Sequence, residues 1–73
     1  MALTDKLDDY DARLLRVFAD NDMLGSKTAK VFRCSTKLIS RNLDLIQKKT
    51  GLDPRRFWNL VKLLAEIQKG GSA

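Results

Sequence analysis

The sequence predicts a single all-α domain of four helices, spanning residues 1–73 and containing a helix-turn-helix. Apolar residues form helical faces in three segments, and a short segment with a candidate N-cap lies between the first two of them. Short polar or glycine-containing stretches separate these segments. The chain has 73 residues, of which 44% are hydrophobic and 32% charged, so it fits one globular domain. A domain of this length buries a modest core, which leaves room for a partner subunit.

The first helix is expected over about residues 8–19. Tyr10, Leu14 and Phe18 lie one turn apart, so they share one face of a helix. Asp8 lies at the start of this segment, where acidic side chains favour a helix N-terminus. We therefore expect this face to pack against the rest of the domain.

The second helix is expected over about residues 26–32. The polar stretch 20–22 and then Gly25 interrupt the preceding helix. Ser26 follows, and serine is a preferred N-cap residue. A short helix that begins at Ser26 is therefore predicted.

The third helix is expected over about residues 36–49, between an N-cap at Ser35 and Gly51, which suits the left-handed position after a helix end. At about 100° per residue, one arc holds the apolar residues Leu38, Ile39, Leu43, Leu45 and Ile46. The remaining arc holds Thr36, Lys37, Ser40, Arg41, Asp44, Gln47 and Lys48. One side is therefore expected to pack and the other to face outward.

The fourth helix is expected over about residues 54–68, because Asp53 is a good N-cap and Pro54 suits the first helical position. Its apolar stripe is wide and comprises Phe57, Trp58, Leu60, Val61, Leu63, Leu64 and Ile67. Such a stripe either forms the centre of the core or also contacts another subunit. Residues 69–73 are expected to form a disordered tail.

Charge is distributed unevenly along the chain. Residues 1–25 carry three basic and six acidic side chains, whereas residues 26–56 carry nine basic side chains and two acidic ones, a net charge of +7. Such a concentrated basic block is typical of a protein that binds a polyanion, because neutralising phosphates releases condensed counterions. A solvated basic face is the alternative interpretation.

A helix-turn-helix is indicated by residues 27–43. The motif needs a small residue where its helices cross, apolar residues flanking the turn, and a second helix with a polar outward face. Ala29 is the small residue, Phe32 and Cys34 flank the turn, and Ile39 is expected to pack inward. These residues predict that the second and third helices form the motif.

Two residues depart from the commonest form of this motif. Arg33 stands in the turn where glycine is frequent, and Asn42 lies inside the apolar arc of the third helix. Cys34 is interpreted as a small buried apolar residue, with a redox sensor as the alternative.

The segment from Thr50 to Pro54, together with Leu43 and Ile46, resembles the C-terminal DNA-binding domain of PucR-type regulators. The similarity extends from about Tyr10 to Ile67. In that family a Thr-Gly-Leu-Asp segment ends the recognition helix and leads into a last apolar helix. The resemblance implies a Fis-like helical fold and a bacterial transcriptional regulator.

The start of the third helix differs in sequence from the start of the recognition helix in PucR-type domains. The following residues are similar to part of the recognition helix of a second family. Residues 35–38 replace the His-Arg-Asn-Thr signature of PucR-type domains. Residues 38–43 are similar to the Leu-Ser-Arg pattern of LysR-type recognition helices, but LysR-type domains continue into a β-wing, whereas this chain continues into a capped helix.

The outward face of the third helix is expected to enter the major groove of double-stranded DNA. Arg41 is the first candidate for a bidentate contact to guanine, followed by Lys37, Thr36 and Ser40. The candidates for phosphate contacts are Lys27, Thr28, Lys30, Arg33, Lys48, Lys49, Arg55 and Arg56. Asp44 is expected to pair with Lys48 one turn on, with acceptance from a cytosine amino group as the alternative.

A homodimer is expected, because one helix-turn-helix covers only a few base pairs and two copies would cover neighbouring half-sites. The fourth or the first helix would form the interface, with Phe57, Trp58, Val61 and Leu64 as the interface candidates. The alternative is a protein-interaction module whose last helix binds another protein. RNA binding is a weaker alternative, since the aromatic residues are expected to pack.

Several functions have no support in the sequence. The chain has no histidine and no glycine-rich phosphate loop, and its carboxylates are expected at capping and surface positions and not clustered in an apolar pocket. We therefore expect no enzyme and no cofactor. A single cysteine without histidine argues against a zinc site. No apolar run is long enough to span a membrane, and the acidic N-terminus lacks the order of a signal peptide. We expect a cytoplasmic, nucleoid-associated protein, and the start at Met1 favours a stand-alone regulator over a fragment.

Overall fold

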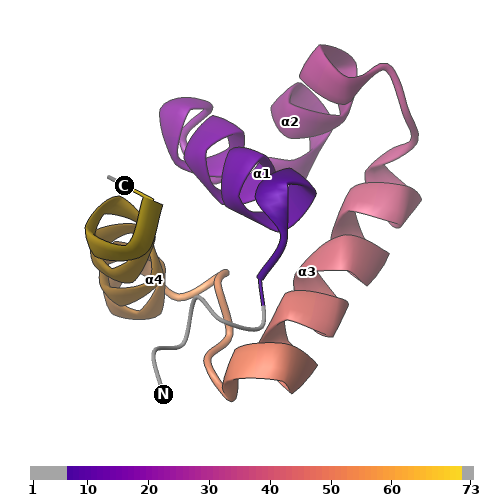
Figure 1. Cartoon of the computed structure of the whole chain (residues 1–73). Coiled ribbons are helices and arrows are strands. Elements are labelled where there is room, and N and C mark those ends of the chain that lie inside the picture. The colour runs from indigo at the N-terminus through magenta and orange to yellow at the C-terminus, as the bar shows by residue number, and fades with distance from the viewer. Residues whose placement is uncertain (1–6, 72–73) are drawn as a thin grey trace.

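The computed structural model describes the backbone of residues 7–71 and the side chains of residues 7–68. This part of the chain forms four helices and no strand: α1 (Asp9–Asp20), α2 (Gly25–Phe32), α3 (Thr36–Thr50) and α4 (Phe57–Gly71) (Figure 1). The predicted all-α domain of four helices is confirmed.

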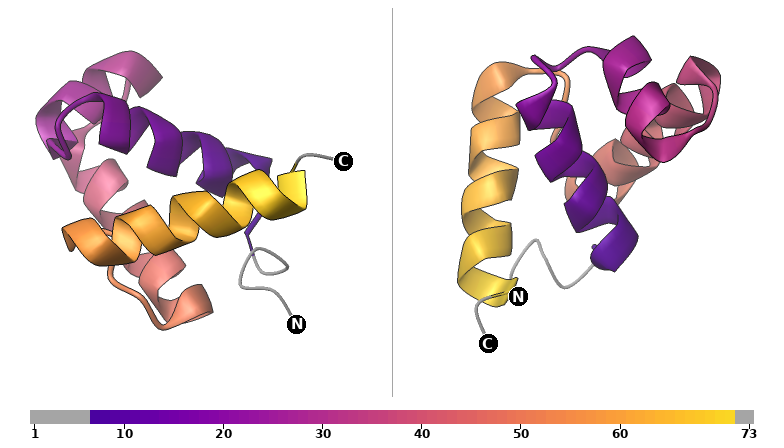
Figure 2. Two further views of the ribbon diagram at one scale, coloured as in Figure 1. Left: turned by 90° about the vertical axis from the view of Figure 1, so that its left-hand side faces the viewer. Right: turned by 90° about the horizontal axis from the view of Figure 1, so that it is seen from above.

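Helix α1 lies at the centre of the domain. It packs against α2 on one side and against α4 on the other, and α2 packs against α3. Figure 2 shows α4 alongside α1, with the α2–α3 pair beyond α1. All four helices contribute to the buried apolar core, which consists of Leu14, Leu15, Phe18, Ala29, Ile39, Leu43, Ile46, Leu60, Leu63 and Ile67.

The start of α1 is fixed by a capping box. The Asp11 backbone N–H donates to the Asp8 carboxylate at 2.8 Å, and the Asp8 N–H donates to the Asp11 carboxylate at 3.4 Å. The Asp11 side chain is only 8% exposed and also accepts a hydrogen bond from the Lys49 ammonium at 2.7 Å. This ion pair joins the first turn of α1 to the last turn of α3, and its hydrogen bond raises the pKa of Lys49.

Helix α2 begins one residue before the expected N-cap. Leu24 takes the N-cap position without a side-chain hydrogen bond, so the prediction that Ser26 caps this helix is wrong. The preceding turn places Asp22 and Met23 in the left-handed region, with φ angles of 60° and 58°. The Met23 N–H donates to the Phe18 carbonyl at 2.9 Å, which closes the end of α1, and α2 begins two residues later at Gly25.

Helix α4 begins at Phe57, three residues later than its predicted start. Asp53 does accept a hydrogen bond from the Arg55 N–H, at 3.0 Å, and its carbonyl accepts from the Arg56 N–H at 3.1 Å. These two bonds form a separate turn around the buried Pro54, so the Asp53 carboxylate caps that turn and not the helix. At the other end, α4 continues through Gly71, where a disordered tail was expected from residue 69; residues 72–73 lie outside the described part.

The buried face of α3 is narrower than the sequence predicts. Ile39, Leu43 and Ile46 are buried, but Leu38 and Leu45 are 41% and 45% exposed. At about 100° per residue the two exposed leucines lie roughly a third of a turn away from the centre of the buried face. The prediction that they pack inward is therefore wrong, and they border the outward face.

Replacing Lys49 with methionine is expected to lower the free energy of unfolding by about 1–3 kcal/mol, because the buried Asp11 carboxylate would lose its ionic partner. Urea denaturation of both proteins measures the difference. Lys48→Met is the matched control: Lys48 is exposed, and its replacement should change stability by no more than about 0.5 kcal/mol. Equal losses in the two variants would contradict this role of Lys49.

The contribution of Lys49 should also depend on pH in one direction. Because its pKa is raised above the ordinary value of 10.5, the ion pair stabilises the fold fully between neutral pH and 10.5. The difference between wild type and Lys49→Met should then shrink as the pH rises through the raised pKa.

Candidate nucleic-acid interface

Helices α2 and α3 are joined by a three-residue turn, Arg33 to Ser35, as predicted for a helix-turn-helix (Figure 1). Arg33 adopts the left-handed conformation, with φ 54° and ψ 47°. The Cys34 N–H donates to the Ala29 carbonyl at 3.0 Å, which closes the end of α2. The Ser35 hydroxyl then accepts from the Leu38 N–H at 3.1 Å, so Ser35 is the N-cap of α3 as expected. The turn thereby fixes where α3 starts.

Small residues allow α2 and α3 to approach closely. Ala29 is buried, and a Cβ atom added at Gly25 would lie 3.4 Å from the Thr36 methyl group. Cys34 is partly buried and packs against the core. The start of α2 therefore lies beside the start of α3.

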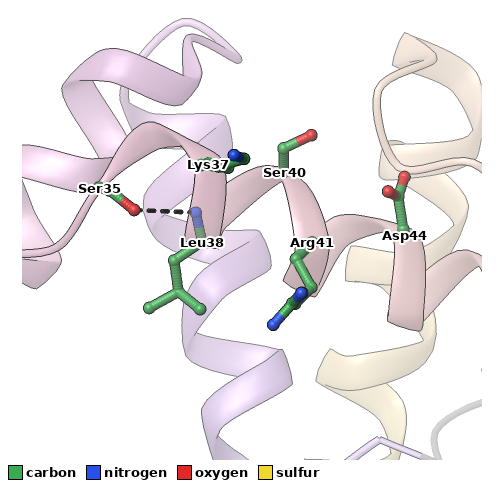
Figure 3. Close-up of a pocket in the computed structure, with 6 residues that line it drawn as sticks. All are labelled: Ser35, Lys37, Leu38, Ser40, Arg41 and Asp44. Atoms are coloured by element: carbon green, nitrogen blue, oxygen red, sulfur yellow. Dashed lines mark hydrogen bonds between the residues drawn. The ribbon is translucent and has the colours of Figure 1, made fainter.

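The outward face of α3 carries the residues predicted to contact bases. Lys37, Arg41, Ser40 and Thr36 are all exposed. In Figure 3 the Ser40 and Asp44 side chains project to one side of α3, whereas Arg41 and Leu38 project to the other. A shallow surface hollow runs along this face and is lined by Ser35, Lys37, Leu38, Ser40, Arg41 and Asp44.

Six of the predicted phosphate-contact residues lie exposed on or near these helices: Lys27, Lys30, Arg33, Lys48, Arg55 and Arg56. Lys27 also forms an exposed ion pair with Asp22 at 3.4 Å, which holds it weakly.

One predicted phosphate contact is wrong, and a second predicted residue is already paired within the domain. Thr28 is fully buried, and its hydroxyl donates to the Leu24 carbonyl at 2.9 Å, so it is not available to a ligand. Lys49 is held by the Asp11 carboxylate at 2.7 Å on the side of α3 that faces α1. The residue type alone, a hydroxyl or a basic side chain, does not show whether a side chain is free to contact a ligand or is bound within the domain.

Arg55 is bound to α3 instead of projecting freely. Its Nη2 atom lies 2.9 Å from the Asp44 carboxylate and donates to the Ser40 carbonyl at 2.9 Å and to the Ser40 hydroxyl at 3.0 Å. Among the ion pairs of residues 7–68, Asp44 therefore pairs with Arg55, and the predicted pair with Lys48 is wrong. No local spacing indicated this contact, because the chain reverses after α3 and brings Arg55 back alongside the helix.

Asn42 also has a partner that the sequence did not reveal. Its side-chain amide donates to the Tyr10 hydroxyl at 2.8 Å, between α3 and α1. The polar residue inside the apolar arc is thereby satisfied, and it ties α3 to the first turn of α1.

The wide apolar stripe of α4 has a buried part and an exposed part, which lie side by side on the helix. Leu60, Leu63 and Ile67 are buried against the core. In the exposed part, Phe57 is 59% exposed, Trp58 73% and Val61 39%, and the half-buried Leu64 continues it. The two aromatic rings pack edge to face, with their centroids 5.3 Å apart. We refer to Phe57, Trp58, Val61 and Leu64 as the α4 patch.

A groove lies beside the α4 patch, between α4 and the end of α1. Its lining is mainly apolar and comprises Ala19, Asp22, Met23, Phe57, Leu60, Val61 and Leu64. Three of the four predicted interface residues therefore line this groove, and the fourth, Trp58, packs against Phe57. All four belong to α4, whereas the outward basic residues belong to α3.

Comparison with protein-family models, with curated proteins and with solved structures finds no match for this chain. The similarity to PucR-type domains stays a prediction from the residues that carry it. Within the part of the chain that the structure describes, no helix combines the length and apolar character needed to cross a bilayer.

Replacing Arg33 with glycine is expected to raise the free energy of unfolding by about 1 kcal/mol, because glycine adopts the left-handed conformation without strain. Thermal or urea unfolding measures the change. Arg33→Ala removes the same charge but keeps a Cβ atom, so it should give no such gain. Equal stabilities of the glycine and alanine variants would show that Arg33 does not hold a left-handed conformation.

Proposed function

We propose that this protein binds double-stranded DNA through α3 and acts as a small transcriptional regulator, in the cytoplasm on the nucleoid, rather than as an enzyme. The observation that carries the proposal is the geometry of α3. Its apolar side is anchored in the core by Ile39, Leu43 and Ile46, while Lys37 and Arg41 project from the opposite side. A rigid helix with basic side chains on its first turns is suited to the major groove.

The exposed side chains divide into two proposed roles. Arg41 and Lys37 would read base edges, since both are exposed near the start of the helix and arginine suits the two acceptors of guanine. Thr36 and Ser40 flank them and would contribute less. The phosphate contacts would come from exposed basic residues around α3: Lys27 and Lys30 on α2, Arg33 in the turn, Lys48 near the end of α3, and Arg56 just before α4. These contacts would position the helix without specifying sequence.

We propose that two copies bind together. One recognition helix contacts only a few base pairs, so useful affinity requires a second half-site. The α4 patch is the surface that we propose for the contact between the copies, because it exposes two aromatic side chains beside an apolar groove. It lies on a different helix from α3, so dimerisation through it would leave both recognition helices free.

A second candidate function is favoured by the same exposed surface. Trp58 is the most exposed large hydrophobic residue in the described part of the chain, and tryptophan is typical of hot spots in protein interfaces. In this alternative, the α4 patch binds a different protein and the basic face of α3 has no nucleic-acid partner.

Binding to a duplex of random sequence is expected at low salt. The logarithm of the binding constant should fall with the logarithm of salt concentration, with a slope of about −4.5 per copy for roughly five phosphate contacts. Fluorescence anisotropy across a salt series measures this slope. No detectable binding at low salt would contradict the proposal and favour the protein-interaction module.

Selection of bound sequences from a random duplex pool then tests the proposed base contacts. Arg41→Ala should lose preference at one base position, at a cost of about 1–3 kcal/mol, whereas a phosphate contact would weaken all sequences equally. The same comparison applies to Lys37→Ala. Lys62→Ala is the control, because Lys62 is exposed on α4 and its removal should leave the preference unchanged.

Sedimentation at micromolar concentration should show a dimer, and Trp58→Ala should shift it to monomer while retaining the helical circular dichroism spectrum. Trp58 is 73% exposed, so its replacement leaves the core intact. Leu24→Ala is the matched control, since Leu24 is 45% exposed but lies outside the α4 patch. A wild-type protein that sediments only as monomer would exclude the proposed dimer.

A further inference from the structure

Asp44 is the one acidic residue in the sequence of α3, and it lies among the basic residues of the outward face. Lys37, Arg41 and Lys48 lie seven and three residues before it and four residues after it, so their positions lie within about 60° of Asp44 around the helix axis. They are its neighbours on the outward face, although the Arg41 and Asp44 side chains project to opposite sides of α3 in Figure 3. The Asp44 side chain is 61% exposed. An unpaired carboxylate at this position would face the phosphates of a bound duplex and repel them.

Arg55 reaches this carboxylate from outside the helix. Its Nη2 atom lies 2.9 Å from Asp44 Oδ1 and also donates to the carbonyl and hydroxyl oxygens of Ser40, at 2.9 and 3.0 Å. One guanidinium nitrogen thus contacts two residues on successive turns of α3.

The backbone around Arg55 is held in place before the guanidinium makes these contacts. The Arg55 N–H donates to the Asp53 carboxylate at 3.0 Å, and the neighbouring Pro54 is buried. The Arg55 side chain is only 36% exposed, although it belongs to a connecting segment. The backbone freedom of Arg55 is therefore already lost before the guanidinium binds Asp44 and Ser40, and only side-chain freedom is lost on binding.

We propose that Arg55 is a positioning residue that masks the Asp44 charge, so that the outward face of α3 can approach a polyanion. This inference rests on the proposed function and names a determinant of affinity within the same interface. Arg55 Nη2 pairs with Asp44 Oδ1 at 2.9 Å, and its Nη1 atom lies farther from a second carboxylate, at 3.5 Å from Asp53 Oδ1. The guanidinium thereby offsets the Asp44 charge.

Loss of Arg55 would have two effects on the face. The Asp44 carboxylate would be left without its external partner and would repel phosphates. It would also pair with Arg41 or Lys48, which lie three and four residues away on the same helix, and would draw them from their own contacts. Both effects disappear when residue 44 carries no charge.

A double-mutant cycle tests this masking. The dissociation constant for one duplex at fixed low salt is measured for wild type, Arg55→Gln, Asp44→Asn and the double variant. Arg55→Gln should weaken binding about tenfold, and adding Asp44→Asn should restore it to within about twofold of wild type. Asp44→Asn alone should bind at least as tightly as wild type.

Arg56→Gln is the matched control, because it removes one positive charge from the exposed residue next to Arg55. Among residues 7–68, Asp44 forms its ion pair with Arg55 and not with Arg56. Its effect on binding should be the same in the wild-type and the Asp44→Asn backgrounds. Arg55→Gln having the same effect in both backgrounds would overturn the masking and make Arg55 an ordinary phosphate contact. Failure of the wild type to bind any duplex would overturn both the masking and the proposed function.

Thermal unfolding of the four proteins separates masking from misfolding. Because exposed ion pairs contribute little to stability, Arg55→Gln should shift the unfolding temperature by less than about 5 °C. Restoration of affinity by Asp44→Asn without a matching rise in unfolding temperature supports the masking. Restoration of both together would overturn it, since the loss would then arise from the fold.

Discussion

The structure depends on the burial of one side of α3. Ile39, Leu43 and Ile46 enter the core formed with the other three helices, and this contact fixes the rotation of α3 about its axis. Because side chains in a helix follow that rotation, the same burial decides that Lys37 and Arg41 face outward. The basic face is thus a consequence of packing on the opposite side, and the turn from Arg33 to Ser35 sets only where the helix begins.

The number and type of the helices followed from the sequence because periodic apolar residues are a strong local signal. Their starts were less predictable, since a capping residue stabilises any turn that exposes N–H groups. Asp53 and Pro54 carry the usual signal for a helix start, yet they form an isolated turn. At α2 the opposite occurs: the helix starts after Leu24 without a side-chain cap, because the preceding turn and packing suffice.

The candidate site was predictable in its composition and not in its internal contacts. Residue type and periodicity placed Lys37 and Arg41 on the exposed side of α3, where the structure has them. The partners of Lys49 and Arg55 depend on chain segments far apart in sequence, so no spacing rule gives them. Thr28 is likewise buried by the packing of α2 against neighbouring helices, and the residues within one turn of Thr28 do not predict that packing.

The links between α3 and the first turn of α1 also bear on motion. The Asn42 amide is bound to the Tyr10 hydroxyl, and the Lys49 ammonium to the Asp11 carboxylate, about two turns apart along α3. Since Asp11 belongs to the capping box of α1, unravelling of that first turn would release the end of α3 as well. The first turn of α1 and the last turn of α3 would therefore open together in a local unfolding event.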